Sequence, residues 1–172
     1  MASKSSTATA SEPKPVVKKL PASQLKSLEV LEGKWDTETV FKNNPKDAGM
    51  GSVSYSWLDG NYYLIGHFEN AFTKGNIHKG IWVLGYDEKV KSTRGHFFDS
   101  MGNERNYEIG IEGRDYHIKG EFERYRGRIE GDTITGTWEK SGDGENWEYL
   151  CDEKMTRVVE RVNIVEQSLN NS

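Results

Sequence analysis

From Lys34 onward, short segments of alternating apolar and polar residues are interrupted at nearly regular intervals by Gly, Asp and Asn. Alternation with a period of two is the pattern of a strand with one buried face, and these interrupting residues favour tight turns. The expected strands are residues 34–42, 51–58, 61–69, 78–86, 90–98, 104–112, 115–122, 124–130, 133–140 and 145–158. Because nearly all connections are of hairpin length, the sequence predicts an all-β, antiparallel up-and-down β-barrel of about ten strands.

Hairpin geometry supports this prediction, because residues that oppose each other across a turn lie on the same face of the sheet. Two-residue turns are expected at 59–60, 113–114 and 131–132, and a four-residue loop at 141–144. The residues then expected to share the inner face are Trp57 with Tyr62, Tyr55 with Leu64, Ile111 with Tyr116, Ile109 with Ile118, Tyr125 with Trp138, and Trp138 with Trp147, Tyr149, Cys151 and Met155. Their neighbours in sequence are mostly polar and are expected to lie outside.

A short helix is expected over residues 21–31, where Leu25, Leu28 and Leu31 recur at helical spacing and Gly33 follows. Residues 1–20 are rich in Ser, Ala, Thr, Lys and Pro and lack an apolar stretch, which predicts a disordered N-terminal tail and no signal peptide. The barrel domain is therefore expected at 21–158, with the helix closing one end and a polar C-terminal tail at 159–172.

Charge and cysteine content exclude several function classes. The formal net charge is -4, whereas nucleic acid as a partner requires a basic field. No apolar run approaches the roughly 20 residues of a membrane span, so no membrane partner is expected. The single cysteine, Cys151, excludes an intrachain disulfide and suits a reducing compartment, which predicts a cytoplasmic location.

The two ends of the expected barrel carry a recognisable pair of motifs. Gly33-Lys34-Trp35 opens the first strand, and Met155-Thr156-Arg157 ends the last. With the turn motifs at 58–60, 84–87, 98–102 and 142–144, they make residues 28–158 similar to a bacterial family of lipocalin-like proteins of the calycin superfamily, whose function is unassigned. The resemblance implies a barrel with a pocket, and a Trp35 ring lying beneath the Arg157 guanidinium at the barrel floor. Such a contact contributes about 0.5–2 kcal/mol. The resemblance transfers no catalytic residues.

Three histidines on neighbouring strands raise the question of a metal, since three histidines and a water can hold catalytic zinc. Alternation places His67 and His117 outside the barrel, and His96 has two possible registers. The sequence therefore predicts surface histidines and no metal site.

A haem site of the nitrobindin type would need an axial ligand inside the barrel. No histidine follows His117, and the inward Cys151 and Met155 are expected to be packing residues. No cofactor is expected.

Two carboxylates are candidates for acid–base chemistry. Asp99 is interpreted as the turn-forming residue of Asp-Ser-Met-Gly. Glu153 has inward parity and is expected to pair with Arg157 or another interior cation. No motif of a nucleophilic triad or of a phosphate-binding loop is present, so no catalytic residue is assigned.

The aromatic residues with inward parity give the strongest functional signal. A barrel of this size can hold a small ligand, and Gly66, Gly120, Gly127 and Gly136 are expected to leave space inside or to permit strand bending. We therefore expect a small lipophilic or planar molecule to bind. The expected binding residues are Tyr55, Trp57, Tyr62, Leu64, Tyr107, Ile109, Tyr116, Tyr125, Trp138, Trp147 and Tyr149.

A protein that binds such a molecule without changing it would be a carrier or a sensor. Two alternatives to this function remain open at this point. The first is an enzyme of the cyclase or isomerase type that uses tyrosines and one carboxylate in the same cavity. The second is a protein-interaction module that uses the basic tail around Lys14, Lys18 and Lys19.

Overall fold

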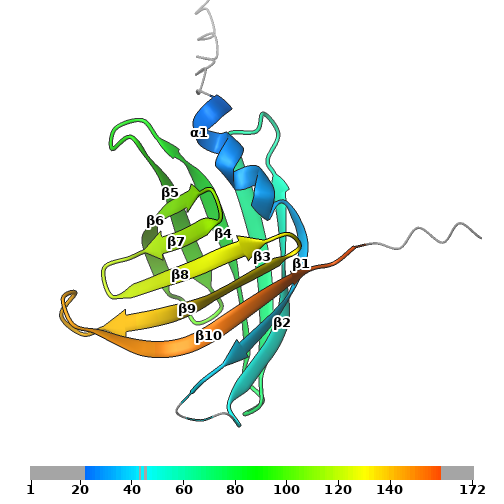
Figure 1. The fold of residues 1–172 in the computed structure, drawn as a ribbon, viewed down its shortest axis with the longest axis vertical. Helices are drawn as coiled ribbons and strands as arrows, with labels where there is room; N and C mark the ends of the chain where they lie inside the picture. Colours follow the sequence, from blue (N-terminus) through cyan, green and yellow to red (C-terminus); the bar gives the residue numbers. More distant parts are fainter. Residues whose placement is uncertain (1–21, 43, 45, 160–172) are drawn as a thin grey trace, which may run out of the picture.

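Ten antiparallel strands form a closed barrel in the order β1-β10-β9-β8-β7-β6-β5-β4-β3-β2, in a computed structural model that describes residues 22–42, 44 and 46–159 (Figure 1). The strands are β1 (Gly33–Val40), β2 (Ala48–Trp57), β3 (Tyr63–Phe72), β4 (Ile77–Asp87), β5 (Ser92–Asp99), β6 (Glu104–Glu112), β7 (Asp115–Lys119), β8 (Glu123–Glu130), β9 (Thr133–Ser141) and β10 (Trp147–Arg157). Each strand pairs with its neighbours in sequence, and β1 closes against β10. The predicted up-and-down barrel is confirmed. The predicted tail at 1–20, and that at 159–172 beyond its first residue, lie outside the described residues.

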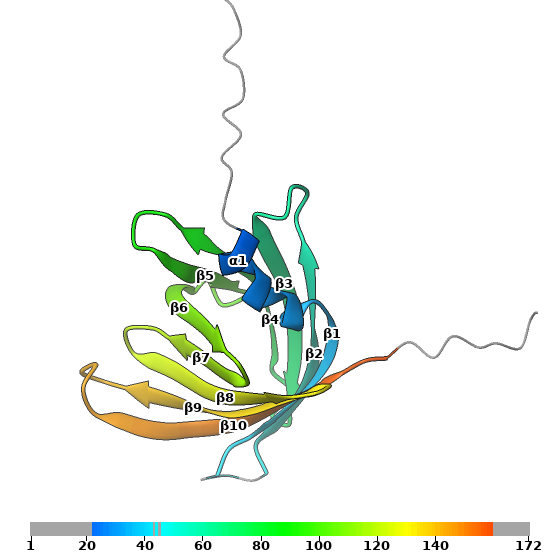
Figure 2. The same ribbon diagram turned by 45° about the horizontal axis from the view of Figure 1, so that its top comes forward.

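The N-terminal helical segment packs against one end of the barrel (Figure 2). It consists of α1 (Ala22–Lys26) and a 3-10 helix, η1 (Ser27–Leu31). Leu25, Leu28 and Leu31 are buried there, as their spacing predicts, and belong to the core. In the described part of the chain, no helix is long and apolar enough to cross a membrane.

Trp35 and Arg157 join this helical segment to the first and last strands. They are direct partners across β1 and β10, with the guanidinium carbon 4.1 Å from the ring centroid. The Trp35 indole N–H donates to Leu31 O at 2.8 Å, and Arg157 donates to the carbonyl oxygens of Val30 and Glu32. Because Trp35 has no exposed surface, this group seals the helix end of the barrel.

Two of the expected hairpins have the expected register. Ile111 pairs with Tyr116 across β6 and β7, and Tyr125 pairs with Trp138 across β8 and β9. The expected register of the first hairpin is wrong by two residues, because the connection occupies 58–62 and Tyr55 pairs with Gly66. Both Gly60 and Asn61 adopt positive φ there, which lengthens the turn. A shift of two residues leaves every side chain on its expected face.

A bulge in β10 changes the face of two aromatic residues. Tyr149 pairs with Glu139 and Cys151 pairs with Trp138, so Leu150 is an extra residue between them. An extra residue reverses the alternation of the strand on one side of the bulge. The inward position expected for Tyr149, and for Trp147 before it, is therefore wrong.

The outer positions of these two residues have their own partners. The Trp147 ring lies under the Arg124 guanidinium, 4.2 Å from its carbon to the ring centroid. The Tyr149 hydroxyl donates to Val40 O at 3.3 Å. Both rings thus help to cover the outer surface of the barrel.

Inward glycines are covered by aromatic rings of the same or the adjacent strand. A Cβ at Gly66 would overlap the Tyr55 ring, and a Cβ at Gly127 or Gly136 would overlap the Tyr125 ring. The expectation that these glycines leave empty space is therefore wrong. They allow large rings to lie flat against the barrel wall.

Candidate functional site

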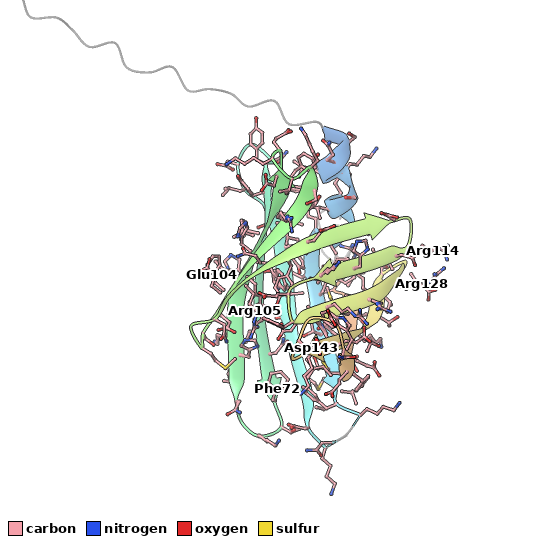
Figure 3. The ribbon with its side chains drawn as sticks, turned by 90° about the vertical axis from the view of Figure 1, so that its left-hand side faces the viewer. Phe72, Glu104, Arg105, Arg114, Arg128 and Asp143 are labelled. Carbon is pink, nitrogen blue, oxygen red and sulfur yellow. The ribbon has the colours of Figure 1, made fainter. Side chains whose placement is uncertain are left out.

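The barrel contains a cavity of about 240 Å³. Its lining includes Phe41, which follows β1, and Phe72, which ends β3, so the cavity extends to the barrel end opposite the helix. Figure 3 shows Phe72 in this part of the molecule, away from the helix. The side chains of Arg105 and Glu123 are 38% and 27% exposed and also line the cavity, which therefore opens to solvent at this end.

One wall of the cavity is a continuous series of aromatic rings. From β3 round to β8 the contacts run Phe68, Phe97, Trp82, Tyr107, Trp138 and Tyr125, with centroid distances of 5.4, 4.8, 5.2, 6.5 and 5.2 Å. The first pair is stacked, at an interplanar angle of 10°, and the others are tilted or edge-on. Such a wall offers ring faces and edges to a planar molecule.

Polar side chains of β1, β3 and β10, namely Thr37, Thr39, Asn70 and Glu153, also line the cavity. Thr37 and Thr39 are 6% and 7% exposed, and the Thr37 hydroxyl donates to Asn70 Oδ1 at 2.7 Å. Thr39 is the partner of Glu153 across β1 and β10. The cavity is thus lined by aromatic rings and by hydrogen-bonding groups.

Glu153 lies at the centre of a buried polar cluster. The Trp138 indole N–H donates to its Oε2 at 3.0 Å. Burial raises the pKa of Glu153, and the hydrogen bond from Trp138 opposes that rise only in part. Burial, and then the nearby Glu153, also raises the pKa of Tyr55 and Tyr125, so both hydroxyls stay protonated. The Tyr125 hydroxyl is buried and has no hydrogen-bond partner among the described residues.

Glu153 has a different partner from the one expected. The Arg157 guanidinium is engaged at the barrel floor, over Trp35, and the carboxyl of Glu153 bonds to Trp138 instead. The expected pairing of Glu153 with Arg157 is therefore wrong. Next to it, burial raises the pKa of the Cys151 thiol to about 12, so this thiol stays protonated and unreactive.

Asp99 and His78 form a fixed pair at the cavity rim. The Asp99 carboxylate has no exposed surface, and its Oδ2 lies 3.0 Å from His78 Nε2. It also accepts hydrogen bonds from the backbone N–H groups of Met101 and Asn103 and from the Asn103 side-chain amide. The role of Asp99 as a turn former is confirmed, and the turn also positions it against His78.

A second pair lies on the other side of the rim. The Tyr107 hydroxyl donates to Glu123 Oε2 at 2.8 Å, and Arg105 Nη1 lies 3.6 Å from the same oxygen. The Arg105 guanidinium also lies 5.7 Å from the Phe97 ring centroid. The charges of Arg105 and Glu123 at this side of the rim thus compensate each other.

Five of the residues expected to bind a ligand line the cavity, namely Tyr55, Tyr107, Tyr116, Tyr125 and Trp138. Four belong to other parts of the described chain: Leu64 and Ile109 are buried in the core, Trp57 packs against that core, and Tyr62 is half-buried in the β2–β3 turn. Trp147 and Tyr149 lie outside because of the bulge.

Sequence reasoning missed His78 and the rings of Phe68, Trp82 and Phe97. Alternation along 78–86 places His78 and Trp82 on the same face of the strand, and this pattern could have identified both as interior residues. The three histidines considered above as metal ligands do not line the cavity: His67 and His96 are exposed, and His117 is half-buried on the outer face.

Glu153→Gln is expected to raise the free energy of unfolding at about pH 8 and to change it little at about pH 4. A carboxyl with a raised folded-state pKa binds its proton more tightly when folded, so wild-type stability falls as pH rises from the unfolded pKa through the folded one. Gln mimics the protonated carboxyl and avoids that loss. Urea denaturation of wild type and variant at both pH values measures the difference in their free energy of unfolding. The contributions of the other acidic residues are the same in both proteins and cancel in this difference. A difference independent of pH would contradict the raised pKa of Glu153.

Solved structures of other proteins resemble this fold. No curated protein matches the chain. The chain is similar to the crystal structure of Rv2717c from M. tuberculosis, with 11% identity and a TM-score of 0.56, over 77% of this chain and 98% of that one. Zebrafish ileal bile acid-binding protein complexed with cholic acid gives 11% identity, coverage of 74% and 98%, and a TM-score of 0.45. A de novo designed fluorescence-activating β-barrel gives 11% identity, coverage of 77% and 97%, and a TM-score of 0.45.

The family model described as "Protein of unknown function (DUF1579)" matches residues 20–110, which is more than half of the chain. This match covers the helix and the strands from β1 to β5 and most of β6. The barrel is closed and up-and-down in topology, with its first and last strands joined through Trp35 and Arg157. The chain belongs to this DUF1579 family of proteins of unknown function.

Proposed function

We propose that this protein binds a small, uncharged, planar organic molecule that carries at least one polar group, inside the barrel. The observation that carries the proposal is the cavity of about 240 Å³, which is lined by aromatic rings together with hydrogen-bonding groups. Its volume is below the roughly 300–1,000 Å³ of pockets for drug-sized ligands, so the molecule is small.

The aromatic side supports a planar ring system. Trp82, Tyr107 and Trp138 present tilted rings from β4, β6 and β9, and an aromatic molecule can stack on a ring face or meet a ring edge. Such contacts contribute about 0.5–1.5 kcal/mol each beyond the burial of apolar area.

The buried polar groups support a hydrogen-bonding substituent. The Tyr125 hydroxyl has no partner among the described residues, and leaving such a group unsatisfied costs about 1–3 kcal/mol. Because the raised pKa of Glu153 favours the neutral acid, Glu153 can donate to an acceptor on the ligand. A carbonyl or ether oxygen is an acceptor for such donors.

The rim supports an uncharged ligand. Arg105 lies next to Glu123, and His78 lies next to Asp99, so both basic side chains that line the cavity in the described part of the chain have an acidic partner. A charged ligand would have to compete with these pairs.

Titration with the neutral dye N-phenyl-1-naphthylamine tests the proposal. We expect saturable quenching of tryptophan emission at about one equivalent, and a rise in melting temperature with dye concentration, because a ligand that binds only the folded state stabilises it. Emission that changes linearly with dye, with no shift in melting temperature, would contradict the proposal.

A further inference from the structure

The cavity brings together an oriented histidine and a buried proton-donating cluster. Asp99 accepts hydrogen bonds from Met101, Asn103 and His78, and although burial opposes its ionisation, these bonds lower the pKa of Asp99. An ionised carboxylate only accepts hydrogen bonds, so His78 Nε2 carries the hydrogen in the bond to Asp99. In the tautomer with the hydrogen on Nε2, the lone pair is on Nδ1, for which no donor is present among the described residues.

The His78 ring is held against the aromatic wall. Its centroid is 5.1 Å from that of Phe68, edge-on, and 6.2 Å from that of Phe97. Its side chain is 23% exposed and lines the cavity. A bound molecule that stacks on this wall therefore lies beside a proton acceptor.

Deeper in the same cavity, proton donors converge. Glu153 is fixed by the Trp138 indole, and Tyr125 has a free hydroxyl. Tyr55 and Tyr116 are buried near Glu153. A neutral carboxyl and a tyrosine hydroxyl are the groups that stabilise the oxygen of an enolate.

We propose that the protein also catalyses a proton shift in a small planar ketone or aldehyde, with His78 as the base and the Glu153–Tyr125 pair as the oxyanion-stabilising group. This inference rests on the proposed binding function. His78 Nδ1 takes a proton from the carbon next to the carbonyl. The electron pair of the broken C–H bond forms a C=C bond, and the carbonyl π electrons move to the oxygen, which accepts hydrogen bonds from Glu153 and Tyr125. Delivery of a solvent-derived proton from His78 to the same carbon is exchange, and delivery of a proton to a conjugated carbon is isomerisation.

The step balances without a metal, an oxidant or a reductant. His78 returns one proton for each proton that it removes, and the imidazolium that forms in between is stabilised by the Asp99 carboxylate. In D2O the imidazolium of the partly exposed His78 exchanges its proton for a deuteron, which it then delivers to carbon. Asp99 acts as a positioning residue, since it touches His78 and not the ligand.

Deuterium exchange into 2-tetralone in D2O, followed by proton NMR, tests this inference with the full chain. We expect wild-type protein to accelerate the loss of the signal from the protons next to the carbonyl above the buffer rate. His78→Gln is expected to lower the protein-dependent rate about a hundredfold or more, since positioned bases contribute roughly 10²–10⁴-fold. His67→Gln is the matched control, because His67 is exposed on the outer face of β3, and its rate should equal that of wild type.

Two further variants separate chemistry from folding. Asp99→Asn keeps Oδ1 for the backbone N–H groups of Met101 and Asn103 but replaces the oxygen that accepts from His78 and from the Asn103 side-chain amide, so exchange should fall, and the melting curve checks that the variant is folded. Tyr125→Phe removes only the free hydroxyl and should slow exchange about tenfold or more.

Binding of 2-tetralone is measured in parallel by tryptophan quenching. Binding with exchange at the buffer rate, or exchange that survives His78→Gln, overturns the acid–base inference and leaves the binding function standing. Failure of both the ketone and the dye to bind overturns both proposals.

Discussion

Replacing Arg157 with Ala should lower the free energy of unfolding by about 3 kcal/mol. The side chain lies over Trp35 and donates to the carbonyl oxygens of Val30 and Glu32. These contacts join the last strand to the first strand and to the 3-10 helix, so their loss opens the barrel seam and the helix contact together. Urea denaturation followed by tryptophan emission measures the change.

Arg157→Lys should recover less than half of this loss, because an ammonium group cannot stack as a plane and offers no fork of donors. Arg128→Ala is the matched control. Arg128 lies on the outer face of the barrel (Figure 3), and its ion pairs with Asp115 and Glu130 are exposed. Such pairs contribute about 0–1 kcal/mol. Equal stability of the Arg157 and Arg128 variants would show that the barrel floor does not depend on Arg157.

Thr39→Phe should weaken binding of N-phenyl-1-naphthylamine at least about a hundredfold, which corresponds to roughly 2.7 kcal/mol. Thr39 is 7% exposed, lines the cavity and lies beside Glu153 across the β1–β10 pair. A phenyl ring at this position occupies space that the ligand requires. Because the ring enters an existing cavity, we expect a smaller loss of stability than the roughly 1–3 kcal/mol of overpacking in a filled core.

Thr135→Phe makes the same chemical change on the outer face of β9, where Thr135 is exposed. This variant should bind the dye as wild type does. Unfolding of the Thr39 variant with no loss in the Thr135 variant would indicate a solid core, and equal loss in both would place the dye on the outer surface.

The strand pattern and most of the barrel could be predicted because turn chemistry and alternation agree. Gly113 and Gly131 have positive φ at two-residue turns, and both hairpins have the expected pairs. The bulge at Leu150 has no such signature, because no glycine or proline marks the extra residue in β10. It moved Trp147 and Tyr149 from the expected cavity to the outer face.

The candidate site could be predicted in part for the same reason. Parity alone placed Tyr55, Tyr116 and Tyr125 in the interior. The His78–Asp99 pair could not be predicted, because its distance depends on the register between β4 and β5, whose connecting turn allows more than one pairing. Sequence alternation defines a face, whereas contacts between strands require the register.

The indole N–H signals of the tryptophans in a nitrogen-15 correlation spectrum test most directly whether a ligand binds inside the barrel. Trp82 and Trp138 line the cavity, and Trp147 lies on the outer surface beneath Arg124. On addition of N-phenyl-1-naphthylamine, we expect the Trp82 and Trp138 signals to shift and to saturate at about one equivalent, while the Trp147 signal stays in place. A shift of Trp147 alone, or no saturable shift of Trp82 and Trp138, would contradict a binding site inside the barrel.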